Sequence, residues 1–238
     1  MIKNRYIIAC SGGGTRWGNY LNTKKHLIKI GNEPLLDRTI RLINNFDPNS
    51  EICIFAFEDE YRRDNTKFCK PTLLDREEHI KYPAIYMSRE YWNLEGNTII
   101  LFGDVFFTEN SMKQITENNN KLNFFGRQGG SSITGKRYGE LFGLSFNKEQ
   151  QKNILNILQN LEQQFKDKKI RRFLTWELYR LINNIDINKH KITNHFIEIN
   201  DLTDDFDFPK DYDIWYENIQ PYLLSTGLVN ISLLLSKL

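Results

Sequence analysis

The sequence predicts an α/β protein with a central, mostly parallel sheet. Three short apolar segments support this prediction: RYIIAC (5–10), EICIFAF (51–57) and TIILFGD (98–104). Their β-branched and aromatic residues are typical of parallel strands that are covered on both faces. Helical patterns lie between these segments, and such alternation indicates a Rossmann-like three-layer sandwich with helices on both sides of the sheet. Ligands of such sheets bind beyond the carboxyl ends of the strands.

The remaining elements follow in chain order. Pro34 opens the helix 34–46, because proline is favoured in a first turn and apolar residues recur there at helical spacing. A second helix is expected after Thr108, through residue 120. Strands at 122–127 and 140–146, joined by a glycine- and serine-rich loop, turn the sheet mixed. Two amphipathic helices (150–165 and 171–184), a strand near 194–199 and a helix from Pro209 complete the order.

Length and charge limit the class of protein. We expect one domain over residues 1–238, because this length supports one large core. The 32 basic and 30 acidic residues leave a net charge of +2, which predicts no general attraction to nucleic acid. No run of about 18 apolar residues exists, so no membrane insertion is expected. Three cysteines fit a reducing, cytoplasmic location. The apolar segment 228–238 is suited to docking on the body or on a second subunit of a homodimer.

A glycine-rich segment, SGGGTR (11–16), follows the first strand. Glycines allow backbone N–H groups to approach a phosphate closely. Two known phosphate loops are excluded by spacing. A dinucleotide fingerprint needs glycine or alanine where Trp17 stands, and a Walker A loop counted from Gly13 reaches Gly18, which is followed by Asn19 and Tyr20 rather than lysine and serine or threonine.

The segment Gly12 to Arg16 has the form Gly-x-Gly-Thr-Arg, and Lys25 follows nine residues later, ahead of PLL (34–36). This order resembles the opening motif of the nucleotidyltransferase superfamily with a glycosyltransferase-A-like fold. That superfamily includes sugar-phosphate nucleotidylyltransferases, cytidylyltransferases and the molybdenum-cofactor guanylyltransferase. Cys10 and Ser11 replace two alanines of the usual motif, and Lys24 replaces a proline. The resemblance implies that the nucleotide is bound by Ser11, Gly12, Gly13, Gly14, Thr15, Arg16 and Lys25.

Two acidic segments strengthen the resemblance. Asp104 ends the strand TIILFGD, where the superfamily has a Gly-Asp motif that binds magnesium. TDDFDFPKDYDIW (203–215) resembles the second metal motif, although Phe208 replaces a helix-capping threonine and Lys210 a glutamate. The resemblance implies a Mg²⁺ site made by Asp104 and Asp207, with Asp205 as the alternate ligand. Taken singly, each aspartate also suits a turn or a helix N-terminus.

The resemblance implies a reaction. An acceptor phosphate attacks the α-phosphorus of a nucleoside triphosphate, and pyrophosphate leaves without a covalent intermediate. CTP or UTP is favoured as the triphosphate, because Ser11 and a compact loop suit a pyrimidine. Arg16, Lys25 and Asp104 are the expected catalytic residues. The acceptor that the resemblance implies is a sugar 1-phosphate, a polyol phosphate or a related small phosphate, and the implied pathway is surface polysaccharide synthesis.

The acceptor should lie against the middle of the chain. Arg127, Lys136 and Glu140 are its predicted contacts, with Trp176 or Tyr179 lining the pocket. Two alternatives stay open. One is a glycosyltransferase of the same fold, although such enzymes usually carry Asp-x-Asp where this chain has Asp104 and Phe106. The other is a non-catalytic nucleotide-binding homologue.

Overall fold

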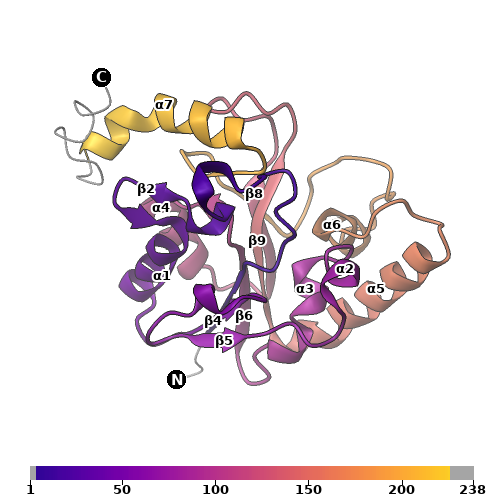
Figure 1. Cartoon of the computed structure of the whole chain (residues 1–238). Coiled ribbons are helices and arrows are strands. Elements are labelled where there is room, and N and C mark those ends of the chain that lie inside the picture. Colours follow the sequence, from indigo (N-terminus) through magenta and orange to yellow (C-terminus); the bar gives the residue numbers. More distant parts are fainter. Residues whose placement is uncertain (1–3, 226–238) are drawn as a thin grey trace.

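A seven-stranded sheet forms the centre of the protein in a computed structural model, which describes residues 4–225 (Figure 1). The strand order is β10-β8-β9-β6-β1-β4-β5. These strands are β1 (Arg5–Ala9), β4 (Glu51–Phe55), β5 (Lys67–Cys69), β6 (Asn97–Phe102), β8 (Leu122–Arg127), β9 (Glu140–Asn147) and β10 (Phe196–Glu198). Every neighbouring pair is parallel except those of β9, which runs antiparallel to β6 and β8. The predicted mixed sheet is confirmed.

Helices cover both faces of this sheet (Figure 1). One face packs on α1 (Leu35–Phe46) and α4 (Glu109–Thr116), and the other on α5 (Lys148–Lys166) and α6 (Thr175–Ile182), with the short helices α2 (Arg76–His79) and α3 (Ala84–Met87). Successive strand residues point to opposite faces. In β1, accordingly, Tyr6 and Ile8 join the core under α1, while Ile7 joins the core under α5. The three-layer prediction is confirmed.

A third apolar cluster holds the C-terminal helix over the carboxyl edge of the sheet. Helix α7 (Pro209–Ser225) packs its Trp215 against Phe106 and Phe206, and the same cluster contains Trp17 from the glycine-rich segment. Two small antiparallel ribbons complete this end: β2 (Lys29–Ile30) with β3 (Glu33–Pro34), and β7 (Val105–Phe106) with β11 (Asp204–Asp205). In the described part of the chain, single 3₁₀ turns lie in the connections at Tyr20–Asn22, Lys25–Leu27, Asp59–Tyr61 and Arg89–Tyr91.

Several boundaries differ from the prediction. The helix expected over 171–184 begins only at Thr175, because the Glu177 carboxylate accepts the Leu174 N–H at 2.9 Å and so fixes the helix start there. The helix after Thr108 ends at Thr116 instead of residue 120. No helix or strand was predicted between residues 58 and 97, where β5, α2 and α3 form. The apolar segment 228–238 lies outside the described residues, and in residues 4–225 no helix is long and apolar enough to cross a membrane.

Candidate active site

Gly103 sets the position of Asp104 at the carboxyl end of β6. The Gly103 N–H donates to the carbonyl of Ala9 at 3.0 Å, which draws this turn against the end of β1. A methyl group at Gly103 would lie 2.5 Å from Sγ of Cys10 and 2.9 Å from the Ala9 oxygen. A side chain therefore does not fit between the two strand ends. The Gly-Asp pair thus has a steric reason in this chain.

The C-terminal acidic motif reaches Asp104 through the β7–β11 ribbon. In this ribbon Asp205 pairs with Val105, and the Phe206 N–H donates to the Asp104 carbonyl at 3.0 Å. Backbone hydrogen bonds thus join segments that lie about a hundred residues apart in the sequence. Three motifs that were predicted to form the site therefore meet at one edge of the sheet. They are the glycine loop, the strand-end Gly-Asp pair and the late acidic motif.

Lys25 and Asp104 form an ion pair at this edge. Their side chains are only 12% and 18% exposed. Burial alone would raise the pKa of Asp104, but the adjacent Lys25 ammonium outweighs that effect and holds the pKa below its ordinary value. Burial likewise opposes the charge of Lys25, whereas Asp104, helped by Asp207 and Asp205, raises its pKa. Both groups are therefore charged at neutral pH, and each neutralises the other.

Arg16 and Asp207 form a second, more open pair. Arg16 Nη1 lies 2.9 Å from Asp207 Oδ2, and the Arg16 side chain is 58% exposed. Its guanidinium also lies 5.2 Å from the centre of the Phe208 ring, a cation–π distance. The residue that departs from the family motif at position 208 thus supports Arg16. Asp211 performs the capping instead, because its carboxylate accepts the N–H groups of Asp207 and Phe208 at 3.2 and 3.0 Å.

Asp205 is held in a different way. Its Oδ2 lies 2.7 Å from Lys136 Nζ, which also donates to the Asp205 carbonyl at 2.9 Å and lies 3.5 Å from Asp211 Oδ2. The other carboxylate oxygen of Asp205, Oδ1, is buried without a hydrogen-bond partner. Burial, which Lys136 counteracts and Asp104 reinforces, raises the pKa of Asp205 to about 7. One oxygen of the Asp205 carboxyl group is therefore left without a partner inside the protein.

These carboxylates suit a hard divalent cation. Asp104, Asp205 and Asp207 supply only oxygen ligands, and Mg²⁺ uses one or two protein carboxylates together with water and phosphate oxygens. The unpartnered Asp205 Oδ1 and the partly exposed Asp207 carboxylate, at 26% exposure, fit that demand. Within residues 4–225 no three His, Cys, Asp or Glu side chains are already gathered as a metal centre. The donor set thus fits a cation that arrives with a phosphate ligand.

The glycine-rich segment forms one wall of a cavity of about 190 Å³. Gly14 has a φ of +59°, a left-handed conformation in which glycine avoids strain. Gly12 and Gly13 are exposed, as are Thr15 and Arg16. The cavity is lined by Gly12, Gly13, Gly14, Trp17, Asn19, Thr23, Lys24, Lys25, His26, Glu58, Tyr61 and Arg76.

Ser11, in contrast, points into the protein. It is 3% exposed, and its hydroxyl lies 2.8 Å from Nε2 of His79. Burial lowers the pKa of His79 to about 4, so this imidazole is neutral at pH 7. The His79 ring packs against Phe55 and Phe57. Ser11 thus anchors the glycine loop to α2, and its side chain does not face the cavity.

The predicted acceptor contacts Arg127 and Lys136 each pair with a carboxylate of the chain itself. Arg127 is 7% exposed, its Nη1 lies 3.2 Å from Asp204 Oδ1, and its Nε donates to the Gly129 carbonyl. Lys136 is committed to Asp205. Neither cation is free of an internal partner, so their contact with an acceptor stays a prediction. The prediction that Tyr179 lines a pocket is wrong, because its side chain is completely buried in the core beside Phe124.

Glu140, the third predicted acceptor residue, has a strongly raised pKa. Burial raises the pKa of Glu140 to about 8, and the nearby Asp205 charge adds to the increase. The folded protein therefore keeps this proton at a pH where the unfolded chain releases it, so Glu140 lowers stability progressively as the pH rises from about 4.5 to 8.

We expect the stability gained by Glu140→Gln to grow across that pH window, by up to about 1.4 kcal/mol per pH unit. Urea unfolding at pH 5 and pH 8 without divalent cations measures it, and a gain equal at both values contradicts the assignment.

Four contacts around the candidate site were not predicted from the sequence: Ser11 with His79, Lys136 with Asp205, Arg127 with Asp204, and Asp211 with the start of α7. Their partners lie 68, 69 and 77 residues apart in the first three. Only the fourth contact could have been predicted from nearby residues. Asp211 is the third residue of the helix that begins at Pro209, and an acidic residue at that position commonly caps the helix N-terminus.

Comparison with known proteins gives a structural answer only. No family model matches the sequence, and no curated protein matches it either. Solved structures do match over most of the chain. The CTP:phosphocholine cytidylyltransferase of Streptococcus pneumoniae superposes with a TM-score of 0.58 at 13% identity, covering 92% of this chain and 100% of the other. The inositol-1-phosphate CTP transferase of T. maritima gives 0.59 at 10% identity, covering 92% and 98%.

The chain has the nucleotidyltransferase fold. A Bacillus anthracis protein assigned as a glucose-1-phosphate thymidylyltransferase agrees, with a TM-score of 0.57 at 11% identity over 90% of this chain and 94% of that one. At identities this low, the superpositions establish the shared fold, and the activity has to be inferred from the residues of the site.

Proposed function

We propose that the chain is a nucleotidyltransferase that transfers a nucleoside monophosphate from a triphosphate to a small phosphorylated acceptor and releases pyrophosphate. The convergence of two ion pairs, Lys25 with Asp104 and Arg16 with Asp207, beside the glycine loop carries this proposal. A triphosphate brings the negative charge that two such cations can bind, and a divalent cation brings the positive charge that the two carboxylates can bind. The site is thus complementary to a metal–triphosphate complex.

Each residue has a part in this reaction. The N–H groups around Gly12 to Gly14 and the Arg16 guanidinium hold phosphate oxygens, while Lys25 supplies a positive charge to the phosphate that is attacked. Asp104 and Asp207 would hold Mg²⁺, which when bound offsets the repulsion between the anionic reactants. Because a phosphate oxygen is already nucleophilic, alignment is the main task, and no protein nucleophile is required.

The substrates form the finer part of the proposal. We propose CTP or UTP as the triphosphate, and a sugar 1-phosphate or polyol phosphate as the acceptor. The cavity of about 190 Å³ against Trp17 and Tyr61 is a compact space, which favours a pyrimidine. Two of the structural neighbours are CTP-dependent by their names, which is consistent with this choice. A role in surface polysaccharide synthesis belongs to the same proposal, as do a cytoplasmic location, the homodimer and a single-domain organisation.

A panel assay tests the reaction. The protein is incubated with Mg²⁺, each nucleoside triphosphate in turn and a set of phosphorylated acceptors, and pyrophosphate is followed. Release that needs both substrates is the expected result. Turnover of a nucleotide-sugar without triphosphate would instead make the chain a glycosyltransferase, and binding without any turnover would make it a nucleotide-binding homologue.

A magnesium titration separates the two candidate second ligands. Asp207 is more accessible than Asp205, whose Oδ2 is committed to Lys136. We therefore expect Asp207→Asn to raise the Mg²⁺ concentration for half-maximal activity by about tenfold or more, and Asp205→Asn to raise it less. The reverse order would assign the metal to Asp205.

A further inference from the structure

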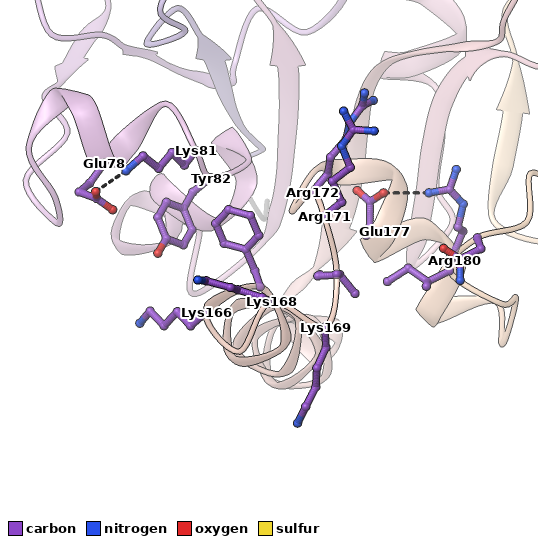
Figure 2. Close-up of a pocket in the computed structure, with 14 residues that line it drawn as sticks. Glu78, Lys81, Tyr82, Lys166, Lys168, Lys169, Arg171, Arg172, Glu177 and Arg180 are labelled. Atoms are coloured by element: carbon purple, nitrogen blue, oxygen red, sulfur yellow. Dashed lines mark hydrogen bonds and ion pairs between the residues drawn. The ribbon is translucent and has the colours of Figure 1, made fainter.

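A second cationic feature lies away from the glycine loop, in a groove between α5, α6 and the segment 76–82 (Figure 2). Its volume is about 1000 Å³. The lining side chains comprise seven lysines and arginines and two glutamates, and so carry a net charge of +5. Because the whole chain carries only +2, the rest of the protein is net negative. The positive charge is therefore concentrated in this groove.

Part of that charge is already paired. Lys81 pairs with Glu78, and Arg180 lies 3.0 Å from Glu177 (Figure 2). Lys166 and Lys169 pair with Glu162 and Asp167. Among the residues that the structure describes, three further cations have no ion-pair or hydrogen-bond partner for their side chains: Lys168, Arg171 and Arg172. All three are exposed.

The two arginines are placed by the fold. They precede α6, whose start is fixed at Thr175 by the Glu177 cap, so Arg171 and Arg172 stay in the turn between α5 and α6. Figure 2 shows both side chains extending in the same direction, away from the end of α5. Adjacent guanidinium groups bind phosphate oxygens bidentately. Because neither guanidinium group is paired with a carboxylate in the described residues, a phosphate could bind them without displacing an internal anion.

The groove also has an apolar floor. Tyr82 and Phe165 pack edge to face with their ring centres 5.9 Å apart, and both are half-buried, as is Ile170. A bare inorganic ion would leave this floor uncovered. The volume is at the upper end of the range for small-molecule sites.

The segment 76–82 separates this groove from the glycine loop. Glu78, Lys81 and Tyr82 face the groove. On the other side of the same segment, His79 contacts Ser11, and Ile80 lies 3.3 Å from the point where a methyl group on Gly13 would be. The groove and the glycine loop therefore lie on opposite sides of the segment 76–82.

We propose that this groove is a second ligand site, which binds a phosphorylated molecule that also carries an apolar or aromatic part. Arg171 and Arg172 take the phosphate, and Tyr82 and Phe165 contact the apolar part. The proposal does not rest on the reaction proposed above. If the chain proves inactive while the groove still binds its ligand, only the reaction is overturned.

Calorimetric titration without divalent cations tests the proposal, in a Lys25→Gln background that weakens the triphosphate site. The probes are inorganic phosphate and phenyl phosphate. We expect phenyl phosphate to bind more tightly than phosphate, and Arg171→Gln with Arg172→Gln to weaken its binding by about tenfold or more. The matched control is Lys70→Gln with Lys152→Gln, which removes the same charge from exposed positions without side-chain partners among the described residues and should leave binding unchanged.

Three results would overturn the proposal. The first is no binding of phenyl phosphate by the Lys25→Gln protein. The second is an equal loss of affinity in the arginine and the lysine double variants, since that would indicate a general charge effect. The third is equal affinity for phosphate and phenyl phosphate, which would show that the apolar part of the ligand makes no contact that contributes to binding. Sedimentation with phosphatidylglycerol vesicles adds a further check, because retention of the protein that depends on Arg171 and Arg172 would indicate a membrane surface instead of a discrete ligand.

Discussion

Asp104→Asn is expected to lower the rate of pyrophosphate release by about 100-fold or more, because it removes a charge from the only strand-end carboxylate that contacts Lys25 in the described residues. The amide keeps the size of the side chain but cannot neutralise Lys25 or hold a divalent cation well. Initial rates with saturating triphosphate, acceptor and Mg²⁺ measure the effect.

Two checks make the Asp104 result specific. Asp59→Asn is the matched control, because Asp59 is exposed and, within residues 4–225, pairs only with the exposed Arg62. The activity of this variant should stay within about twofold of the wild type, as expected for a surface substitution. Thermal unfolding shows whether the Asp104 variant is folded, since leaving Lys25 unpaired also lowers stability. A folded Asp104→Asn protein with full activity would remove Asp104 from the metal site.

Gly103→Ala is expected to destabilise the fold by about 2 kcal/mol or more, because the added methyl group would lie 2.5 Å from Cys10 Sγ and 2.9 Å from the Ala9 carbonyl. The strand ends β1 and β6 must then separate, which also displaces Asp104. The free energy of unfolding in urea measures the effect, and activity should fall with it.

Gly12→Ala is the control for that substitution. A methyl group at Gly12 would meet no atom within 4 Å, and its φ does not demand glycine. Its free energy of unfolding should therefore stay within about 0.5 kcal/mol of the wild type. Equal destabilisation by both alanines would contradict the steric account of the Gly-Asp turn.

The parallel part of the sheet could be predicted because its cause is local. RYIIAC, EICIFAF and TIILFGD are apolar on both faces, and such runs suit strands between two helical layers. The segment around α2 and α3 gave no such pattern, because these helices are one turn long and are held by contacts such as Ser11 with His79. The late start of α6 depends on one side chain, Glu177, that a periodicity does not single out.

Some residues of the candidate site could likewise be predicted from the sequence, and others could not. The order of its motifs along the chain indicated Arg16, Lys25, Asp104 and the acidic motif, and the structure brings these segments together. The partners of Arg127 and Lys136 were hidden, because Asp204 and Asp205 approach them only once the β7–β11 ribbon has formed. The predicted acceptor contacts Arg127 and Lys136 are therefore paired with carboxylates of the chain itself, whereas Arg171 and Arg172, which the sequence pattern placed in a helix, lie ahead of that helix with no ion-pair partner among the described residues.

Phosphorus NMR of the complete reaction tests the central claim most directly. The protein is incubated with Mg²⁺, CTP or UTP, and the acceptor that supports the fastest release of pyrophosphate. We predict the appearance of one pyrophosphate for each new diphosphate diester, with no inorganic phosphate and no signal change when the acceptor is omitted. Consumption of the triphosphate to inorganic phosphate, or no consumption with any acceptor, would contradict the assignment of this edge of the sheet as a nucleotidyl-transfer site.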